Sequence, residues 1–285
     1  MPKGLSIHIG INEIDESKYG TKAELKNPEN DALTMAGVAA ANRYETLATL
    51  LTKDATSERV TASLKEAASR LTGGDILLLT YAGHGAQVPD KNGDEPDRRD
   101  ETWVLYDRQF IDDELYALFG SFDEDVRILV LSDSCHSGSV ARDLSLFLDK
   151  SELERAFDTS EPAEVRTRMR VLPQDAQFRN YQRDQELYDR IQQTVPAMEH
   201  AEIGADILLI SGCQDNQTSS DGAGANGLFT ETFLKTWKNG AFQGTYSSLH
   251  RQIVEQMPFY QTPNLFQAGK ASAAFTGQSP LAIQV

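Results

Sequence analysis

The stretch LVLSDSCHSGS, residues 129–139, changes abruptly from apolar side chains to small and polar ones. Together with residues 126–128, its apolar part has the length and composition of a strand buried in a sheet. An acid and a thiol follow at once, Asp133 and Cys135. Ligands of open α/β sheets bind beyond the carboxyl ends of the strands, so the stretch predicts both a buried strand and a site at its end.

A second apolar run, DILLLTYAGHG at residues 75–85, also ends in small residues, and these surround His84. If the two strands are neighbours, His84 and Cys135 meet at the same edge of the sheet. A cysteine nucleophile needs such a base, and glycines let backbone N–H groups approach a reacting carbonyl. An isolated Cys and His would be better interpreted as core residues. Two glycine-flanked strand ends favour a catalytic dyad instead.

Other chemistries fit these residues less well. His136 would point away from Cys135 in an extended chain, and no neighbouring serine lies in a G-x-S-x-G segment. The five histidines and two cysteines of the chain lack the spacing of zinc ligands.

Strand-like and helix-like segments alternate along most of the chain. Apolar or β-branched runs predict strands at residues 5–11, 44–51, 75–85, 101–107, 126–134 and 205–212. Helical spacing predicts helices at residues 27–42, 56–71, 111–120, 228–237 and 246–257. The alternation predicts an α/β fold, a three-layer α/β/α sandwich with a mostly parallel central sheet. Residues 141–205 are rich in charged side chains, and we expect part of them to be helical.

Composition narrows the class of partners. The chain has 285 residues and a formal net charge of −16, which argues against nucleic acid and anionic membranes as partners. Its first residues lack the order of a signal peptide, and no apolar stretch approaches the roughly 20 residues that span a bilayer. The two cysteines do not make a disulfide framework. We therefore expect a cytoplasmic protein.

Several separate motifs resemble one family. YAGHG (81–85), LVLSDSCHSGS (129–139), ISGCQDNQTSSD (210–221) and GLFTETFL (227–234) follow each other as in the metacaspases, and especially as in their compact prokaryotic relatives. The resemblance extends from about residue 5 to 268. It implies a single caspase-like catalytic domain over 1–285, with a first part at 1–140, a charged insert at 141–205 and a small part at 206–285. The caspase signature Q-A-C-x-G is absent, which favours a metacaspase over an aspartate-cutting caspase.

The resemblance also implies the roles of the reacting groups. Cys135 is the nucleophile of a cysteine endopeptidase, and His84 is the general acid/base. The backbone N–H groups of Gly85 and Cys135 would stabilise the oxyanion. This chemistry requires no cofactor.

Metacaspases cut after Arg or Lys, and the resemblance assigns the first specificity pocket (S1) to Asp31 and Asp133. A carboxylate deep in a pocket binds a guanidinium through charge-assisted hydrogen bonds. Taken alone, Asp31 is better explained as a helix N-terminal acid, and Asp133 can be a carboxylate that orients backbone. The presence of both acids favours the pocket. Ser211 and Cys213 would line the cleft, although Cys213 is as well explained as a core thiol. The family pattern is altered at Pro28 and Ala82.

Many metacaspases use calcium, and the matching acids here are Asp100, Asp112, Asp113 and Asp143. Hard oxygen ligands suit this ion. An EF-hand at residues 90–101 is rejected, because Glu95 takes the place of the required glycine. A solvated acidic loop explains residues 90–101 equally well.

The charged insert contains three closely spaced arginines, Arg166, Arg168 and Arg170. If the cluster is exposed, an Arg-specific peptidase can cut itself there. The alternative is a helical flap whose arginines pair with neighbouring acids. The resemblance further implies protein or peptide substrates with a basic residue before the cut, and a monomer. Two other functions remain open, a relative with another preference at S1 and a non-catalytic binding scaffold.

Overall fold

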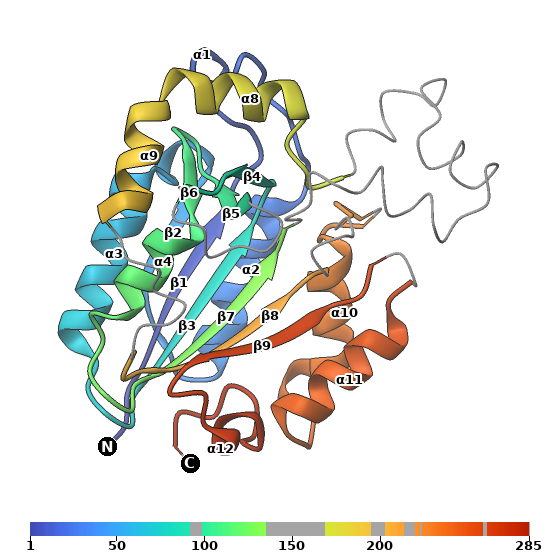
Figure 1. Ribbon diagram of the computed structural model, residues 1–285. Coiled ribbons are helices and arrows are strands. Elements are labelled where there is room, and N and C mark those ends of the chain that lie inside the picture. The colour runs from blue at the N-terminus through green and yellow to red at the C-terminus, as the bar shows by residue number, and fades with distance from the viewer. Residues whose placement is uncertain are drawn as a thin grey trace.

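The computed structural model describes residues 1–91, 99–134, 169–194, 203–213, 220–222, 224–258 and 261–284. In this part of the chain, six strands form a central sheet in the order β2-β1-β3-β7-β8-β9, and Figure 1 shows helices on both sides of it. All neighbours pair in parallel except β9, which is antiparallel to β8. The strands are β1 (Gly4–Gly10), β2 (Glu45–Leu51), β3 (Ile76–Ala82), β7 (Arg127–Asp133), β8 (Asp206–Ser211) and β9 (Asn264–Gly269). The predicted α/β sandwich with a mostly parallel sheet is confirmed.

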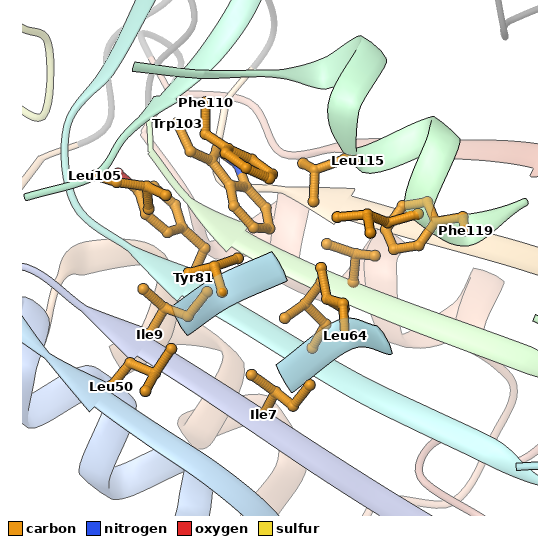
Figure 2. Close-up of a cluster of buried hydrophobic side chains, with 14 of the residues drawn as sticks. Ile7, Ile9, Leu50, Leu64, Tyr81, Trp103, Leu105, Phe110, Leu115 and Phe119 are labelled. Carbon is orange, nitrogen blue, oxygen red and sulfur yellow. The ribbon is translucent and has the colours of Figure 1, made fainter. Parts of the chain in front are cut away.

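Side chains alternate across the sheet because successive residues of a strand point to opposite faces. Leu77 and Leu79 of β3 pack with α3 (Ser57–Arg70) and α4 (Asp112–Phe119). Figure 2 shows this cluster, with Leu64 of α3 and Leu115 and Phe119 of α4 directed toward the strands. The strands of the sheet are thereby covered on this face by apolar side chains.

The opposite face carries a second apolar cluster, which includes Ile76 and Leu78 of β3. Three helices cover it: α2 (Pro28–Ala41), α10 (Leu228–Trp237) and α11 (Tyr246–Gln256). The continuous apolar runs of the central strands therefore reflect burial on both faces, as is typical of parallel sheets.

A small antiparallel sheet follows the central strand β3. It consists of β4 (Gly85–Pro89), β5 (Arg99–Val104) and β6 (Gln109–Ile111), in that order. Trp103 of β5 stacks on Tyr81 at the end of β3, with ring centroids 4.5 Å apart. The strand predicted at 75–85 thus ends at Ala82, and His84 lies in the turn between the two sheets.

The described end of the charged insert is helical. It forms α8 (Gln174–Arg183) and α9 (Gln185–Thr194), and the stacked rings of Tyr181 and Tyr188 join the two. The Tyr188 hydroxyl also accepts from the backbone N–H of Gln109 in β6, so the helix pair is fixed to the small sheet. The described segments also contain two short α-helices, α1 (Glu16–Tyr19) and α12 (Ala273–Thr276), and two short 3-10 helices, η1 (Thr52–Asp54) and η3 (Lys238–Gly240). Within the described segments, no helix combines the length and apolarity needed to cross a membrane.

Candidate active site

The two strands that carry the expected dyad are neighbours at the centre of the sheet. The β3–β7 register pairs Ala82 with Asp133, so His84 and Cys135 each follow a paired residue by two positions. Cys135 itself lies outside the described residues. Ser134, the residue before it, is fully buried, and its carbonyl oxygen accepts from the Cys213 thiol at 3.3 Å.

His84 is held as a neutral imidazole with one nitrogen available. Its Nε2 lies 2.7 Å from the Ala23 carbonyl oxygen, which can only accept, so Nε2 carries the proton. Nδ1 has no hydrogen-bond partner among the described residues. Burial lowers the pKa of His84 to about 4, the nearby Arg170 charge lowers it further, and the Ala23 and Val171 backbone oppose this. A neutral His84 can accept a proton at Nδ1.

Arg170 fills an acidic pocket beside this imidazole. Its side chain is fully buried, and its guanidinium meets the carboxylates of Asp31, Asp133 and Asp221. Nη2 lies 2.5 Å from Asp31 Oδ2 and 3.1 Å from Asp221 Oδ1. Nη1 lies 2.9 Å from the Asp133 carbonyl oxygen and 3.0 Å from its carboxylate. All four terminal N–H bonds of the guanidinium thus have acceptors.

The three carboxylates are held by backbone donors of their own. Gly227 N–H donates to Asp31 Oδ1 at 2.9 Å, and Thr230 donates to Asp133 Oδ2 through both its N–H and its hydroxyl. Lys26 N–H donates to Asp221 Oδ2 at 2.7 Å. The pocket is therefore built to stabilise anions before any cation enters, which is the arrangement that binds a basic side chain well.

The backbone around Arg170 is also fixed. The Arg170 carbonyl oxygen accepts from Gly85 N–H at 2.9 Å, and Leu172 N–H donates to the Gly85 carbonyl at 3.0 Å. On the other side, Met169 forms an antiparallel bridge with Ser220. The segment 169–172 thus lies between Gly85, the first residue of β4, and Ser220, with the Arg170–Val171 peptide beside His84.

Gly227, which has no side chain, leaves the space that the Arg170 guanidinium occupies at the bottom of the pocket. A Cβ built there would lie 2.3 Å from Arg170 Nη2 and 2.6 Å from Asp133 Oδ2. The backbone at Gly227 has φ −60° and ψ 154°, which any residue adopts. Glycine is therefore needed for space and not for conformation.

The charges in the pocket act on one another. Although burial alone lowers the pKa of Arg170, the Asp133, Asp31 and Asp221 charges raise it above its ordinary value. Burial raises the pKa of Asp31 to about 7, and the Asp133 charge adds to this, while Arg170 and Gly227 N–H oppose it. Three carboxylates thus face one cation, and burial beside a second carboxylate makes the protonated form of Asp31 easier to reach.

The structure distributes the residues expected in S1 differently. Asp31 and Asp133 contact Arg170 directly. The Ser211 hydroxyl donates to the Cys213 carbonyl oxygen at 2.8 Å. The Cys213 thiol is fully buried and donates to the Ser134 carbonyl oxygen. The Ser211 and Cys213 side chains therefore stabilise the backbone next to the site. Asp221 and Gly227 were missed. Asp221 ends the motif at 210–221, and an acid after a third buried strand was the available signal.

The arginine cluster of the insert is only partly described. Arg166 and Arg168 lie outside the described residues. The self-cleavage hypothesis assumed an exposed cluster, whereas Arg170 is fully buried and paired with acids. The cause is the pocket: carboxylates from three distant segments compensate its charge, which a count of polar residues along the sequence does not reveal.

The acids expected to bind calcium are described only in part. Burial raises the pKa of Asp112 well above its ordinary value, and the charges of Glu101, Asp100 and Asp113 add to this, so the four carboxyl groups are close. Among the described residues, however, no group of three or more acids, histidines or cysteines is arranged to hold a metal ion. Asp143 lies outside them.

Comparisons with known proteins agree with this architecture. A family model described as "Peptidase_C14: Caspase domain" matches residues 3–274. Metacaspase-1A of Aspergillus oryzae is 29% identical over 215 residues, which covers 67% of this chain and 49% of the relative. Metacaspase-6 of Arabidopsis thaliana is 34% identical over 143 residues, 46% of this chain and 37% of the relative. The chain thus spans about half or less of the length of these curated relatives.

Two solved structures are also similar. The crystal structure of protein GSU0716 from Geobacter sulfurreducens is 44% identical, with a TM-score of 0.86 and full coverage of both chains. Caspase-1 from Spodoptera frugiperda is 11% identical, with a TM-score of 0.55 over 93% of this chain and 86% of that one. The second likeness is one of fold alone.

Proposed function

The chain belongs to the caspase-domain peptidase family, and on that ground we propose that it is a cysteine endopeptidase that cleaves proteins or peptides after arginine or lysine. Cys135 is the nucleophile and His84 the general acid/base. Asp31 and Asp133 belong to the S1 pocket that receives the basic side chain. We further propose that the enzyme acts as a monomer in the cytoplasm, where its thiol stays reduced.

One observation carries the proposal, the position of Arg170. Its guanidinium is surrounded by the carboxylates, its carbonyl oxygen accepts from Gly85 N–H, and its peptide bond to Val171 lies beside His84. These are the contacts that a peptidase makes with the residue before the cut: a charged pocket, an oxyanion donor and an acid/base.

The geometry supports a two-step acyl transfer. Nδ1 of His84 accepts the proton of the Cys135 thiol, and the sulfur attacks the carbonyl carbon of the basic residue. The negative charge that develops on the carbonyl oxygen is stabilised by Gly85 N–H. His84 then gives the proton to the leaving amine, the C–N bond breaks, and a thioester remains. Water hydrolyses the thioester and restores the thiol.

We propose that the first substrate is the chain itself, cut between Arg170 and Val171. The uncut segment fills the pocket, so other substrates enter only after the cut, when Arg170 leaves. The residues after the cut would stay in place, because Leu172 is fully buried and its carbonyl oxygen accepts from Gln177 at 2.5 Å.

Calcium remains a proposal. The mutual repulsion around Asp112 supports a cation there, since a bound ion would relieve it. The described residues do not complete a site, and no step of the reaction above uses the ion.

Three fluorogenic peptides that differ only in the residue before the cut, Arg, Lys or Asp, test the proposed activity. We expect cleavage of the Arg and Lys peptides, and its loss in Cys135→Ala and His84→Ala. His250→Ala is the matched control, because His250 lies on α11, away from the pocket residues, and bonds the Pro263 carbonyl. Cleavage of the Asp peptide alone would overturn the basic specificity. An inert wild type with an unreactive Cys135 thiol would indicate a binding scaffold.

A further inference from the structure

We infer that Trp103 is a positioning residue of the proposed dyad, because it links the ends of the two strands that precede His84 and Cys135. The inference rests on the proposed peptidase function and concerns the geometry of that site. Trp103 lies on β5 and is 4% exposed. It acts through two neighbours, since its ring stacks on Tyr81 of β3 and its indole N–H donates to Ser132 of β7.

The stacked pair holds the backbone of His84. The rings of Tyr81 and Trp103 are nearly parallel, at 4°, and both belong to the cluster of Figure 2. The Tyr81 hydroxyl donates to the His84 carbonyl oxygen at 2.6 Å, and this oxygen also accepts from Val104 N–H at 3.0 Å. A Cβ at Gly83 would lie 2.7 Å from the Tyr81 hydroxyl oxygen, so the glycine leaves the space through which the hydroxyl reaches His84.

The indole N–H holds the residues that precede Cys135. The indole nitrogen can only donate, and it lies 3.1 Å from the Ser132 hydroxyl oxygen. That oxygen lies 2.9 Å from the hydroxyl oxygen of Ser134, and either hydroxyl can be the donor. Both serines are buried, and they lie on the face of the sheet opposite to the Asp133 side chain, since successive residues alternate. Trp103 thus reaches the nucleophile's segment without touching the acidic pocket.

Packing alone requires neither polar group of the stacked pair, because two phenylalanines would also fill an apolar core. Here the hydroxyl of Tyr81 bonds the end of one strand and the N–H of Trp103 bonds the end of the next. Acyl transfer depends on the distance between base and nucleophile, and a misplacement of about 1 Å can lower the rate about 100-fold. The pair sets this distance by fixing both strand ends to one rigid unit.

Steady-state kinetics with the Arg peptide measure this role in Ser132→Ala and Trp103→Phe. The first variant removes the acceptor and keeps the indole, whereas the second removes the donor and keeps an aromatic ring on Tyr81. We expect kcat to fall roughly 10- to 100-fold in each, with KM within about twofold, because the acidic pocket is untouched. Since both substitutions break the same bond, kcat of the double variant should be close to that of the slower single variant.

Thr102→Val is the matched control, because it removes another buried hydroxyl of β5, whose partner is the Gln109 side chain at 3.1 Å. Thr102 points to the other face of that strand, so we expect wild-type kcat. Melting curves set a temperature at which every chain is folded. Wild type and variants are compared in the same state, cut or uncut after Arg170, as their intact mass shows.

The rate at which iodoacetamide alkylates Cys135 at neutral pH gives a second readout, which requires no peptide cleavage. Peptide mapping by mass spectrometry separates this thiol from Cys213, which is buried. A base held beside the thiol increases its reactivity, so we expect alkylation to slow at least about fivefold in Ser132→Ala and Trp103→Phe. The Thr102→Val control should keep the wild-type rate.

Wild-type values of kcat and of the alkylation rate in both variants would overturn the inference and leave Trp103 as a core residue. A raised KM at unchanged kcat, or losses that multiply in the double variant, would also overturn it. If the wild type cleaves no peptide, the proposed function fails, and the alkylation rates still decide whether Trp103 positions the thiol. Should either variant not fold, Tyr81→Phe decides: it keeps the stack, and a wild-type kcat would overturn the inference.

Discussion

Gly227 sets the depth of the acidic pocket, because a methyl group there would overlap the guanidinium and the Asp133 carboxylate. We expect Gly227→Ala to reduce kcat/KM for the Arg peptide roughly 10- to 100-fold, the usual effect of overpacking a filled site. The backbone conformation at this position accepts alanine, but the overlap with the buried Arg170 and Asp133 side chains should also lower the melting temperature of the uncut chain. Steady-state kinetics and a melting curve measure both effects.

Gly224→Ala is the control for that substitution. Gly224 lies three residues earlier, and the nearest atom to a Cβ there is Glu231 Oε2 at 3.4 Å, an ordinary contact at the end of a flexible side chain. Full activity of Gly227→Ala on the Arg peptide would show that basic side chains do not reach this depth.

Asp31 gives the pocket a pH dependence. Its folded-state pKa of about 7 is raised by burial, and only the anionic form attracts a cation. As pH falls through that pKa, Asp31 takes up a proton, so the pocket loses affinity for arginine. We expect KM for the Arg peptide to rise roughly three- to tenfold from pH 8 to pH 6.

The same titration should leave kcat nearly constant, because the pKa of His84 lies at about 4, below that range. A fall in kcat at unchanged KM would instead assign the titration to the dyad. Inhibition by benzamidine, a guanidinium-like cation, offers a second measure, since its inhibition constant should follow KM.

The positions of individual pocket residues could be predicted where those residues belong to a short sequence motif. Asp31 and Asp133 were named from short motifs, and both contact the Arg170 guanidinium. Asp221 and the burial of Arg170 could not be found in this way, because they depend on the spatial meeting of segments far apart in the chain. Hydrophobic periodicity predicts which face of a helix or strand is buried, but it does not predict which charged residue from a distant segment will contact that face.

The extended segment 169–172 also contributes to the stability of the fold, because it carries the buried Arg170 that pairs with three carboxylates. Arg170→Ala leaves three buried carboxylates without their cation, and breaking a buried ion pair in this way costs about 3–5 kcal/mol. Protonation of Asp31 relieves part of that cost at low pH. Without Arg170 the pKa of Asp31 rises further above its unfolded value, so this relief is present at low pH and is lost as pH rises.

We therefore expect Arg170→Ala to lower the free energy of unfolding more at pH 8 than at pH 6. To prevent self-cleavage from obscuring the result, both chains should carry Cys135→Ala. Arg179→Ala is the control, because Arg179 pairs with Asp175 at the surface of α8. Denaturant titrations at the two pH values give the comparison, and a pH-independent difference would contradict the coupling to Asp31.

Helices and strands with strong patterns could be predicted to within a few residues, whereas weak ones could not. The helix expected at 228–237 has those bounds in α10, and the strand expected at 5–11 is β1 (Gly4–Gly10). β9 (Asn264–Gly269) was missed, because it is a half-buried edge strand with no clear alternation. The small sheet was missed as a unit. The strand predicted at 101–107 overlaps β5, but of β4 only Gly85 lay in a predicted strand, and no strand was predicted at β6.

Calcium binding, if it occurs, would affect the stability of the molecule as a whole. If the acids around Asp112 bind calcium, the ion stabilises only the folded chain. We expect the melting temperature of Cys135→Ala to rise with calcium and to return to its starting value when a chelator is added. Asp112→Asn should weaken this response, and an unchanged melting temperature would contradict calcium binding by these acids.

The proposed order of events, a folded uncut chain that first cuts itself after Arg170, can be read from the intact mass of the purified protein. Wild type should resolve into two pieces, 1–170 and 171–285, while Cys135→Ala and Arg170→Ala remain whole at that bond. Reporter cleavage should appear with the same time course as the cut. A wild-type chain that cleaves the Arg peptide while remaining uncut at 170, or a Cys135→Ala chain that is cut there, would contradict the account.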